Sequence, residues 1–289
     1  MQALLPLLAV LPFVSAASAT SAAGLAAPQV LVSASASKVS ATGNSGAANL
    51  RRRAQLSSAD PRRALVSAHC PEGMALVSGG YCVDRYEASL VEVLDDGREQ
   101  AWPFNMPVDG HHVRALSEAD VMPQAHISGA EAAVACKASG KRLCKMAEWR
   151  KACRGRRGTA FPYGPMRAAY TCNDHGRSPM AALGLVHMRA DGTATEYGEF
   201  ETMNHPALNE VPGTLAPTGG HEQCLSDEGV VDMVGNLHEW VDDPRGTFLG
   251  GYYQDTTQNG DGCAYSTYAH NFRYHDYSTG FRCCADATP

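Results

Sequence analysis

Beyond its first residues, this sequence has no long hydrophobic run, no internal repeat and no excess of basic residues. Residues 1–65 hold six of the 24 Lys and Arg but only one of the 30 Asp and Glu. The rest of the chain therefore has 18 basic and 29 acidic residues, a formal charge of about −11. Because contact with phosphate requires positive charge, we expect no nucleic-acid partner. We also do not expect the chain to be an integral membrane protein once the leader is removed, because no later segment is long and apolar enough to cross a bilayer as a helix.

The first 23 residues have the pattern of a secretory signal peptide, although no Lys or Arg precedes the apolar run. That run, from Leu4 to Val14, is followed by small residues and is too short to cross a bilayer as a helix. Residues 24–65 are rich in Ala, Ser and Arg without hydrophobic periodicity, which predicts a disordered linker. Residues 66–289 form the predicted folded domain. The leader predicts a secreted or periplasmic protein.

Cysteine is absent from the first 69 residues, and the ten later cysteines include no C-x-x-C pair and no cysteine–histidine cluster at ligand spacing. This absence argues against a zinc site. An even number of cysteines in an exported chain favours disulfides. Cys70 and Cys82, twelve positions apart across the first predicted strand, can close a local bridge.

Helical periodicity is scarce, so we expect short strands and long loops with two clear helices. In residues 128–140, Ser128 and Glu131 have capping-box spacing, and Ala132, Ala135 and Cys136 share one face. A second helix is predicted in residues 144–155, where apolar residues recur at three- and four-residue steps. Residues 247–255, with a glycine pair, and residues 278–286 are predicted strands.

Four segments in order carry a family pattern: "GMALVSGGYCVDRYEAS" (73–89), "SGKRLCKMAEWRKACRG" (139–155), "GVVDMVGNLHEWVDD" (229–243), and "LGGYYQD" continuing to "TGFRCCAD". Together they resemble the formylglycine-generating enzyme, or sulfatase-modifying factor, domain. The typical sequence motifs of that family are G-K-R-L-P-T-E-A-E-W, G-N-V-W-E-W, R-G-G-S-W and G-F-R. The resemblance implies an α+β, modified C-type-lectin-like fold with little regular secondary structure, braced here by disulfides.

The resemblance also implies bound calcium as a structural cofactor. Its ligands in the G-N-x-W-E-W segment would be Asn236 and Glu239, whose oxygens suit a hard cation. Asn173 stands in a position similar to a second calcium site of the family, and the loop at 255–262 only partly imitates a calcium loop. His238, where the family often has tryptophan, is interpreted as a surface or packing histidine.

The best-known members bind copper(I) through two cysteine thiolates and oxidise a substrate cysteine to formylglycine. Between Gly251 and Arg282 this chain has one cysteine, Cys263. Arg273 resembles the family's arginine before G-F-R, and counting back from it places the two thiol positions near Tyr265 and Gly260. Counting forward from Gly250 and Gly251 instead places the first thiol position near Asp255. One cysteine cannot form a two-thiolate centre, so we do not expect formylglycine synthesis by that mechanism.

Family members with disulfides suggest two further bridges. The first helix is joined to the cysteine after G-F-R, which here means Cys136 with Cys283. The second helix is joined to a cysteine before the family's arginine, which here means Cys153 with Cys263. The resemblance leaves the pairing of the other four cysteines open: Cys144, Cys172, Cys224 and Cys284.

Two classes of function therefore remain for this domain. Other branches of the superfamily use iron and oxygen or oxidise tyrosine during siderophore maturation, and His270, His275 and Asp276 supply the ligand types of an iron site. The sequence favours an oxidative or peptide-modifying relative, with copper or iron left open. The alternative is a non-catalytic lectin-like binding module, for which the tyrosine-rich segments are suitable. The ligand, polypeptide or small molecule, is not specified.

Overall fold

The computed structural model of this chain describes residues 68–188, 194–195, 200–268 and 270–289. The predicted signal peptide, residues 1–23, and the predicted linker, residues 24–65, lie outside the described residues. Within the described part, no helix combines the length and the apolar character needed to cross a membrane.

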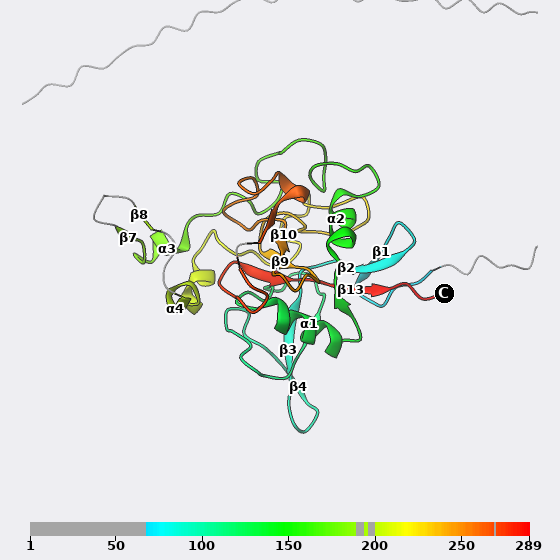
Figure 1. Ribbon diagram of the computed structural model, residues 1–289, viewed down its shortest axis with the longest axis horizontal. Coiled ribbons are helices and arrows are strands. Elements are labelled where there is room, and N and C mark those ends of the chain that lie inside the picture. The colour runs from blue at the N-terminus through cyan, green and yellow to red at the C-terminus, as the bar shows by residue number, and fades with distance from the viewer. Residues whose placement is uncertain (1–67, 189–193, 196–199, 269) are drawn as a thin grey trace, which may run out of the picture. The chain divides into compact units, whose positions relative to one another are not determined.

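Short strands form three small sheets and one two-stranded ribbon (Figure 1). The first sheet has the order β1 (Met74–Val77), β2 (Tyr81–Asp84), β13 (Cys283–Asp286), β6 (Arg142–Leu143). The second has the order β11 (Ser266–Thr267), β10 (Phe248–Leu249), β9 (His238–Trp240), β12 (Thr279–Phe281). The third has the order β4 (Glu99–Ala101), β3 (Ser89–Val93), β5 (Val113–Leu116), and β7 (His187–Met188) pairs with β8 (Ala194–Thr195). This mixture agrees with the predicted α+β class.

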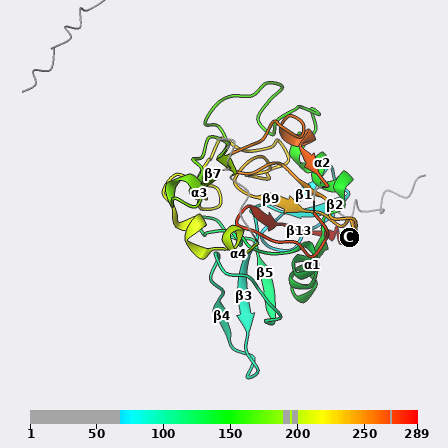
Figure 2. The same ribbon diagram turned by 60° about the vertical axis from the view of Figure 1, so that its left-hand side comes forward.

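The helices of the described residues are short: α1 (Gly129–Ala138), α2 (Met146–Arg154), α3 (Pro179–Ala182) and α4 (Phe200–Met203), with single 3-10 turns at Pro206–Glu210 and Gly262–Ala264. The predicted capping box of α1 is confirmed, since Ser128 Oγ accepts from the Glu131 amide and the Glu131 carboxylate accepts from the Ser128 amide. Its predicted apolar face is buried, and the helix packs against β5 and β6. Figure 2 shows α1 beside β5. The second predicted helix is α2, which buries Trp149 and Cys153.

Two predicted strands differ from the structure. In residues 247–255, β10 ends before Gly250, because the backbone there takes a φ of +84°. A Cβ at this position would lie 2.8 Å from the Met233 carbonyl oxygen, so the close packing requires glycine. Residues 278–286 form two strands, β12 and β13, in different sheets. Arg282 separates them and turns its side chain into the core.

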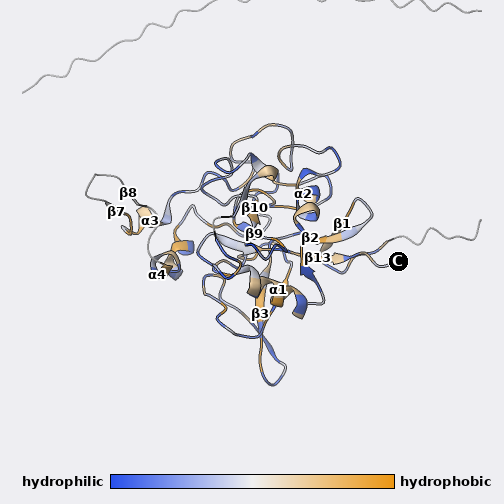
Figure 3. Ribbon diagram, in the orientation of Figure 1, coloured by the Kyte–Doolittle hydropathy of each residue, from blue (hydrophilic) through white to orange (hydrophobic). Residues whose placement is uncertain are grey.

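Two apolar clusters hold the sheets together, one containing Trp149 and Leu249, the other containing Trp240 and Phe281. Figure 3 shows that the hydrophobic residues concentrate in strands and short helices, while many connecting loops are hydrophilic. Since so much of the chain is loop, covalent bridges carry part of the stability. Five disulfides account for all ten cysteines: Cys70–Cys82, Cys136–Cys283, Cys144–Cys284, Cys153–Cys263 and Cys172–Cys224.

Three of these bridges are the pairs expected from the sequence and the resemblance: Cys70–Cys82, Cys136–Cys283 and Cys153–Cys263. The pairs left open are Cys144–Cys284 and Cys172–Cys224. Cys144 precedes α2 and Cys284 lies on β13, so this bridge fastens the last strand to the start of a helix. The disulfides thus tie both helices to the C-terminal half of the domain.

Candidate functional site

The G-N turn before β9 is held by close backbone packing. Gly235 has a φ of +79°, and a Cβ at this position would lie 2.2 Å from the Asn173 carbonyl oxygen. Asn236 follows with a φ of +57°, a left-handed conformation that asparagine tolerates. The turn therefore brings the side chain of Asn236 into the core, where it is 2% exposed.

Asn236 and Asn173, both predicted calcium ligands, lie in contact. The Asn236 Oδ1 accepts from Asn173 Nδ2 at 2.8 Å and from the Ala216 amide at 3.0 Å. The Asn236 Nδ2 donates to Glu87 Oε2 at 2.6 Å and to the Ala216 carbonyl at 3.1 Å. All four hydrogen-bonding positions of the Asn236 amide are thus used within the protein.

Glu239, the other predicted calcium ligand, forms a fully buried ion pair with Arg282. Glu239 Oε1 accepts from Arg282 Nη2 at 2.6 Å, and Glu239 Oε2 accepts from Arg282 Nε at 2.7 Å. The indole of Trp149 also donates to Glu239 Oε2, at 2.6 Å. The remaining guanidinium hydrogens reach the backbone carbonyls of Asp84, Arg85 and Val231. We call this the Glu239–Arg282 clasp; it joins β9 to the link between β12 and β13.

Two more carboxylates lie close to the clasp. Burial raises the pKa of Glu87 well above its usual value, and the nearby charges of Asp232 and Glu239 raise it further. Burial also raises the pKa of Asp232 to about 6. Both shifts reflect the cost of placing negative charge in the interior. Glu239 is the carboxylate that contacts the guanidinium of Arg282 directly.

In this arrangement the oxygens of Asn236 and Glu239 do not fit a calcium ion, because a cation there would have to displace Asn173 or Arg282. The loop at 255–262 also uses its ligand-type groups internally: Asp255 Oδ1 accepts from the amides of Thr257 and Gln258, and Asn259 donates to the Tyr265 hydroxyl. Calcium binding, expected from the resemblance, is therefore not expected at these residues in this arrangement.

A chelator experiment tests it. We expect the melting temperature of the protein in EDTA to equal that in millimolar calcium, because protein donors already hold the oxygens of Asn236 and Glu239. The measurement is differential scanning calorimetry, with magnesium as the control cation. A melting temperature that falls in EDTA and returns with calcium alone would support the predicted calcium site.

A cleft of about 610 Å³ opens beside β9. It is lined by Met203 of α4, by His238, and by side chains of the 248–267 stretch, His270 and the 274–278 segment. We call it the His238 cleft. Two of the positions at which the resemblance placed a thiol, Asp255 and Tyr265, line this cleft. The only cysteine of that window, Cys263, is bonded to Cys153.

A hydrogen-bonded row runs along one wall of the cleft. Asp276 Oδ1 accepts from the Ser278 hydroxyl at 2.7 Å, and Ser278 Oγ lies 3.2 Å from His238 Nδ1. The other ring nitrogen of His238, Nε2, lies 3.4 Å from the Tyr265 hydroxyl. Burial lowers the pKa of His238 to about 4, so the imidazole is neutral at neutral pH. A neutral imidazole can accept a proton on one side and donate on the other.

The residues proposed for an iron site do not converge. His270 is stacked on Tyr274 with ring centres 3.6 Å apart, and it lines the cleft together with Asp276. His275 instead contacts the side-chain oxygen of Asn204 through Nδ1 at 2.8 Å. Among the residues that the structure describes, no group of three His, Cys, Asp or Glu side chains is arranged to hold a metal ion.

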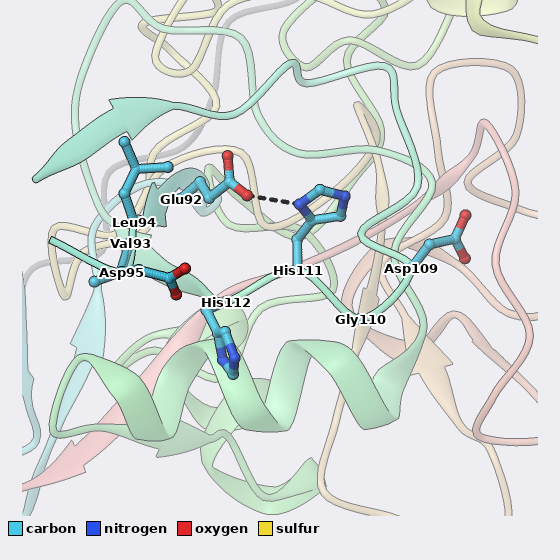
Figure 4. A pocket seen from close by; sticks show the side chains of 8 residues that line it. All are labelled: Glu92, Val93, Leu94, Asp95, Asp109, Gly110, His111 and His112. Atoms are coloured by element: carbon cyan, nitrogen blue, oxygen red, sulfur yellow. Dashed lines mark hydrogen bonds and ion pairs between the residues drawn. The ribbon is translucent and has the colours of Figure 1, made fainter. Parts of the chain in front are cut away.

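A second, shallower hollow of about 300 Å³ lies by β3 and the start of β5. Glu92 Oε1 and His111 Nδ1 are 2.6 Å apart, and this hydrogen bond lowers the pKa of Glu92. Figure 4 shows that Asp109 and His112 point away from this pair. The hollow therefore contains one hydrogen-bonded pair at the surface, and its other side chains do not converge on that pair as ligands would.

The sequence did not predict that His238 and Ser278 line a cleft together. His238 was interpreted as a surface or packing residue; it is 6% exposed and packs on Phe248, but it also faces the cleft. The available signal was the replacement of the family's tryptophan by a smaller, titratable ring. Nothing local marked Ser278, since its partner His238 lies 40 positions earlier.

The model of the sulfatase-modifying factor enzyme 1-like domain family matches residues 69–287. The chain belongs to this family. Family membership confirms the fold predicted from the four motifs. A search of curated proteins found no match for this sulfatase-modifying-factor-like protein.

Solved structures with similar folds include the P3c variant of the Major Tropism Determinant, at 19% identity, a TM-score of 0.43 and coverage of 76% of this chain and 54% of that one. PvdO from Pseudomonas aeruginosa has 15% identity, a TM-score of 0.37 and coverage of 71% and 80%. CarF has 18% identity, a TM-score of 0.33 and coverage of 70% and 59%. The sulfatase-modifying-factor-like protein thus spans about half the length of the tropism determinant.

Proposed function

We propose that this protein is an exported binding member of its family and that its ligand, a polypeptide segment or small molecule, occupies the His238 cleft. The observation that carries the proposal is the cleft itself. It has the size of a ligand site, about 610 Å³, and lies where the resemblance places the family's chemistry. Five disulfides support export to a secreted or periplasmic location.

The chemistry of the cysteines favours binding over copper-dependent oxidation. All ten cysteines are in disulfides, and Cys263, the only one in the family's catalytic window, is 0% exposed and bonded to α2. A copper(I) centre of the known type needs two free thiolates. The protein keeps the cleft and lacks those ligands.

A modifying enzyme is the second candidate, favoured by the row from Asp276 through Ser278 and His238 to Tyr265. Ser278 donates to Asp276, and the Nδ1–H tautomer of His238 can donate to Ser278, which leaves Nε2 as an acceptor for the Tyr265 hydroxyl. This order resembles the arrangements that orient a general base. A role in oxidation additionally requires a cofactor whose ligands these residues do not define.

A random hexapeptide pool tests the proposal. We expect immobilised protein to retain a subset of peptides, and Gln258→Trp to abolish retention, because Gln258 is exposed at the cleft and a bulky ring would obstruct it. Gln223→Trp is the matched control, since Gln223 is also exposed but does not line the cleft. Mass spectrometry identifies the retained peptides.

Two outcomes would speak against binding as the function. Equal retention by the parent protein and Gln258→Trp would show that the cleft is not the binding site. Recovered peptides with an altered mass, absent when His238→Gln replaces the parent protein, would show that the second candidate is correct.

A further inference from the structure

Aromatic rings surround the imidazole of His238 on several sides. The ring centre of His238 lies 4.5 Å from Phe248, 4.8 Å from Tyr252 and 5.5 Å from Tyr265. These residues lie on β10 and in the segment between β10 and β11. Their packing gives the cleft one wall made of ring faces and edges.

A second group of rings lines the cleft from the segment before β12. Tyr274 stacks on His270, and Tyr277 stands edge-on to Tyr252 with ring centres 6.2 Å apart. Tyr252 and Tyr277 are 25 residues apart in the chain, yet they line the same cleft. A ligand there would meet aromatic surfaces from both.

The charged groups of the cleft are all acidic. Asp255 and Asp276 line it, and its lining residues include no Lys or Arg. The two lining histidines add no positive charge at neutral pH, because burial lowers the pKa of His238 to about 4 and also lowers that of His270. The negative charge of Asp276 also acts on a neighbouring ring. Burial raises the pKa of Tyr277, and the charge of Asp276 raises it further.

We propose that the His238 cleft takes an organic cation: an arginine or lysine side chain, or a quaternary ammonium group. This inference rests on the proposed function, since it names the ligand class of the same cleft. Aromatic faces attract cations through the ring quadrupole, most strongly where water is excluded. Two carboxylates in a partly enclosed cleft add a negative potential that the low dielectric of the walls strengthens. An anionic ligand would meet no compensating charge there.

Two pairs of matched probes test the charge requirement. N-acetylarginine amide is compared with N-acetylcitrulline amide, and choline with the neutral alcohol in which carbon replaces its ammonium nitrogen. Isothermal titration calorimetry should show the cation of at least one pair binding about tenfold more tightly than its neutral analogue. Which pair binds distinguishes a peptide side chain from a quaternary ammonium. Equal affinity for cation and neutral analogue in both pairs, or no binding of any probe, would overturn the proposal.

A charge-removing variant tests the location. Asp255→Asn keeps the side-chain oxygen that accepts from the amides of Thr257 and Gln258, at 2.9 and 3.0 Å, but loses the charge. We expect it to weaken binding of the cation about fivefold and to leave the neutral analogue unaffected. Asp261→Asn, in the same loop but exposed and outside the cleft, should change neither. An equal loss in both variants would mean that the acidic loop, not the cleft, attracts the cation.

The failure of this inference differs from the failure of the proposed function. If the cleft retains peptides that have neither Arg nor Lys, and Gln258→Trp abolishes that retention, the cleft binds ligands but is not selective for cations.

Discussion

Replacing Glu239 by glutamine should lower the free energy of unfolding by about 3–5 kcal/mol, because it leaves the guanidinium of Arg282 buried without its anionic partner. Arg282 is 0% exposed, and both oxygens of Glu239 accept its hydrogens. Glutamine can accept with one oxygen only and carries no charge. Urea denaturation followed by circular dichroism measures the change.

The control for this variant is an exposed ion pair. Asp96 Oδ2 accepts from Arg98 Nε at 2.7 Å with both side chains more than half exposed, so Asp96→Asn should leave the stability almost unchanged. A loss in Glu239→Gln no larger than in Asp96→Asn would show that the Glu239–Arg282 clasp does not hold the strands together.

Removing the disulfide between α1 and β13 should cost about as much as removing the local bridge near the start of the domain, although its two cysteines are far apart in the chain. The Cys136–Cys283 bridge closes a loop with a sequence separation of 147, and Cys70–Cys82 one of 12. Because the neighbouring Cys144–Cys284 bridge already joins the same two segments, removing Cys136–Cys283 opens a loop of only about ten residues, and the chain-entropy model gives a loss of about 3 kcal/mol for each bridge. The experiment compares the double alanine variants Cys136→Ala/Cys283→Ala and Cys70→Ala/Cys82→Ala in urea denaturation.

The double variants avoid a free thiol, which would otherwise exchange with the other bridges. A clearly larger loss for Cys136→Ala/Cys283→Ala than for the local bridge would contradict the chain-entropy explanation. In that case, packing around the sulfur atoms would be the dominant contribution.

Local signals in the sequence predicted the elements that depend on neighbouring residues. Ser128 and Glu131 are three positions apart and cap α1, as expected. The strand expected to run to Asp255 ends at Leu249, because Gly250 takes a φ of +84°; it packs against the Met233 carbonyl, which is close in space but 17 positions away in the chain. Distant contacts of this kind leave no local pattern.

In the candidate site, too, the sequence indicated single residues but not their distant partners. The sequence motif singled out Glu239, but it could not show that Arg282, 43 positions later, would be its partner. Asn236 and Asn173 were both selected, and the structure brings their side chains together at 2.8 Å. The His238 cleft combines Met203 with residues as late as Ser278, so its existence depends on the complete fold.

The adjacent cysteines of β13 have a consequence for how the domain matures. Neighbouring residues on a strand face opposite sides, and Cys283 joins the cluster of α1 while Cys284 joins that of α2. A slip of one residue in the pairing of β13 would exchange the two sulfur atoms between Cys136 and Cys144. Each sulfur is separated from its partner by 147 or 140 positions, so the two long loops can be oxidised correctly only after the whole stretch between the helices and β13 has been synthesised. Register and bond pairing are then selected together in one late step.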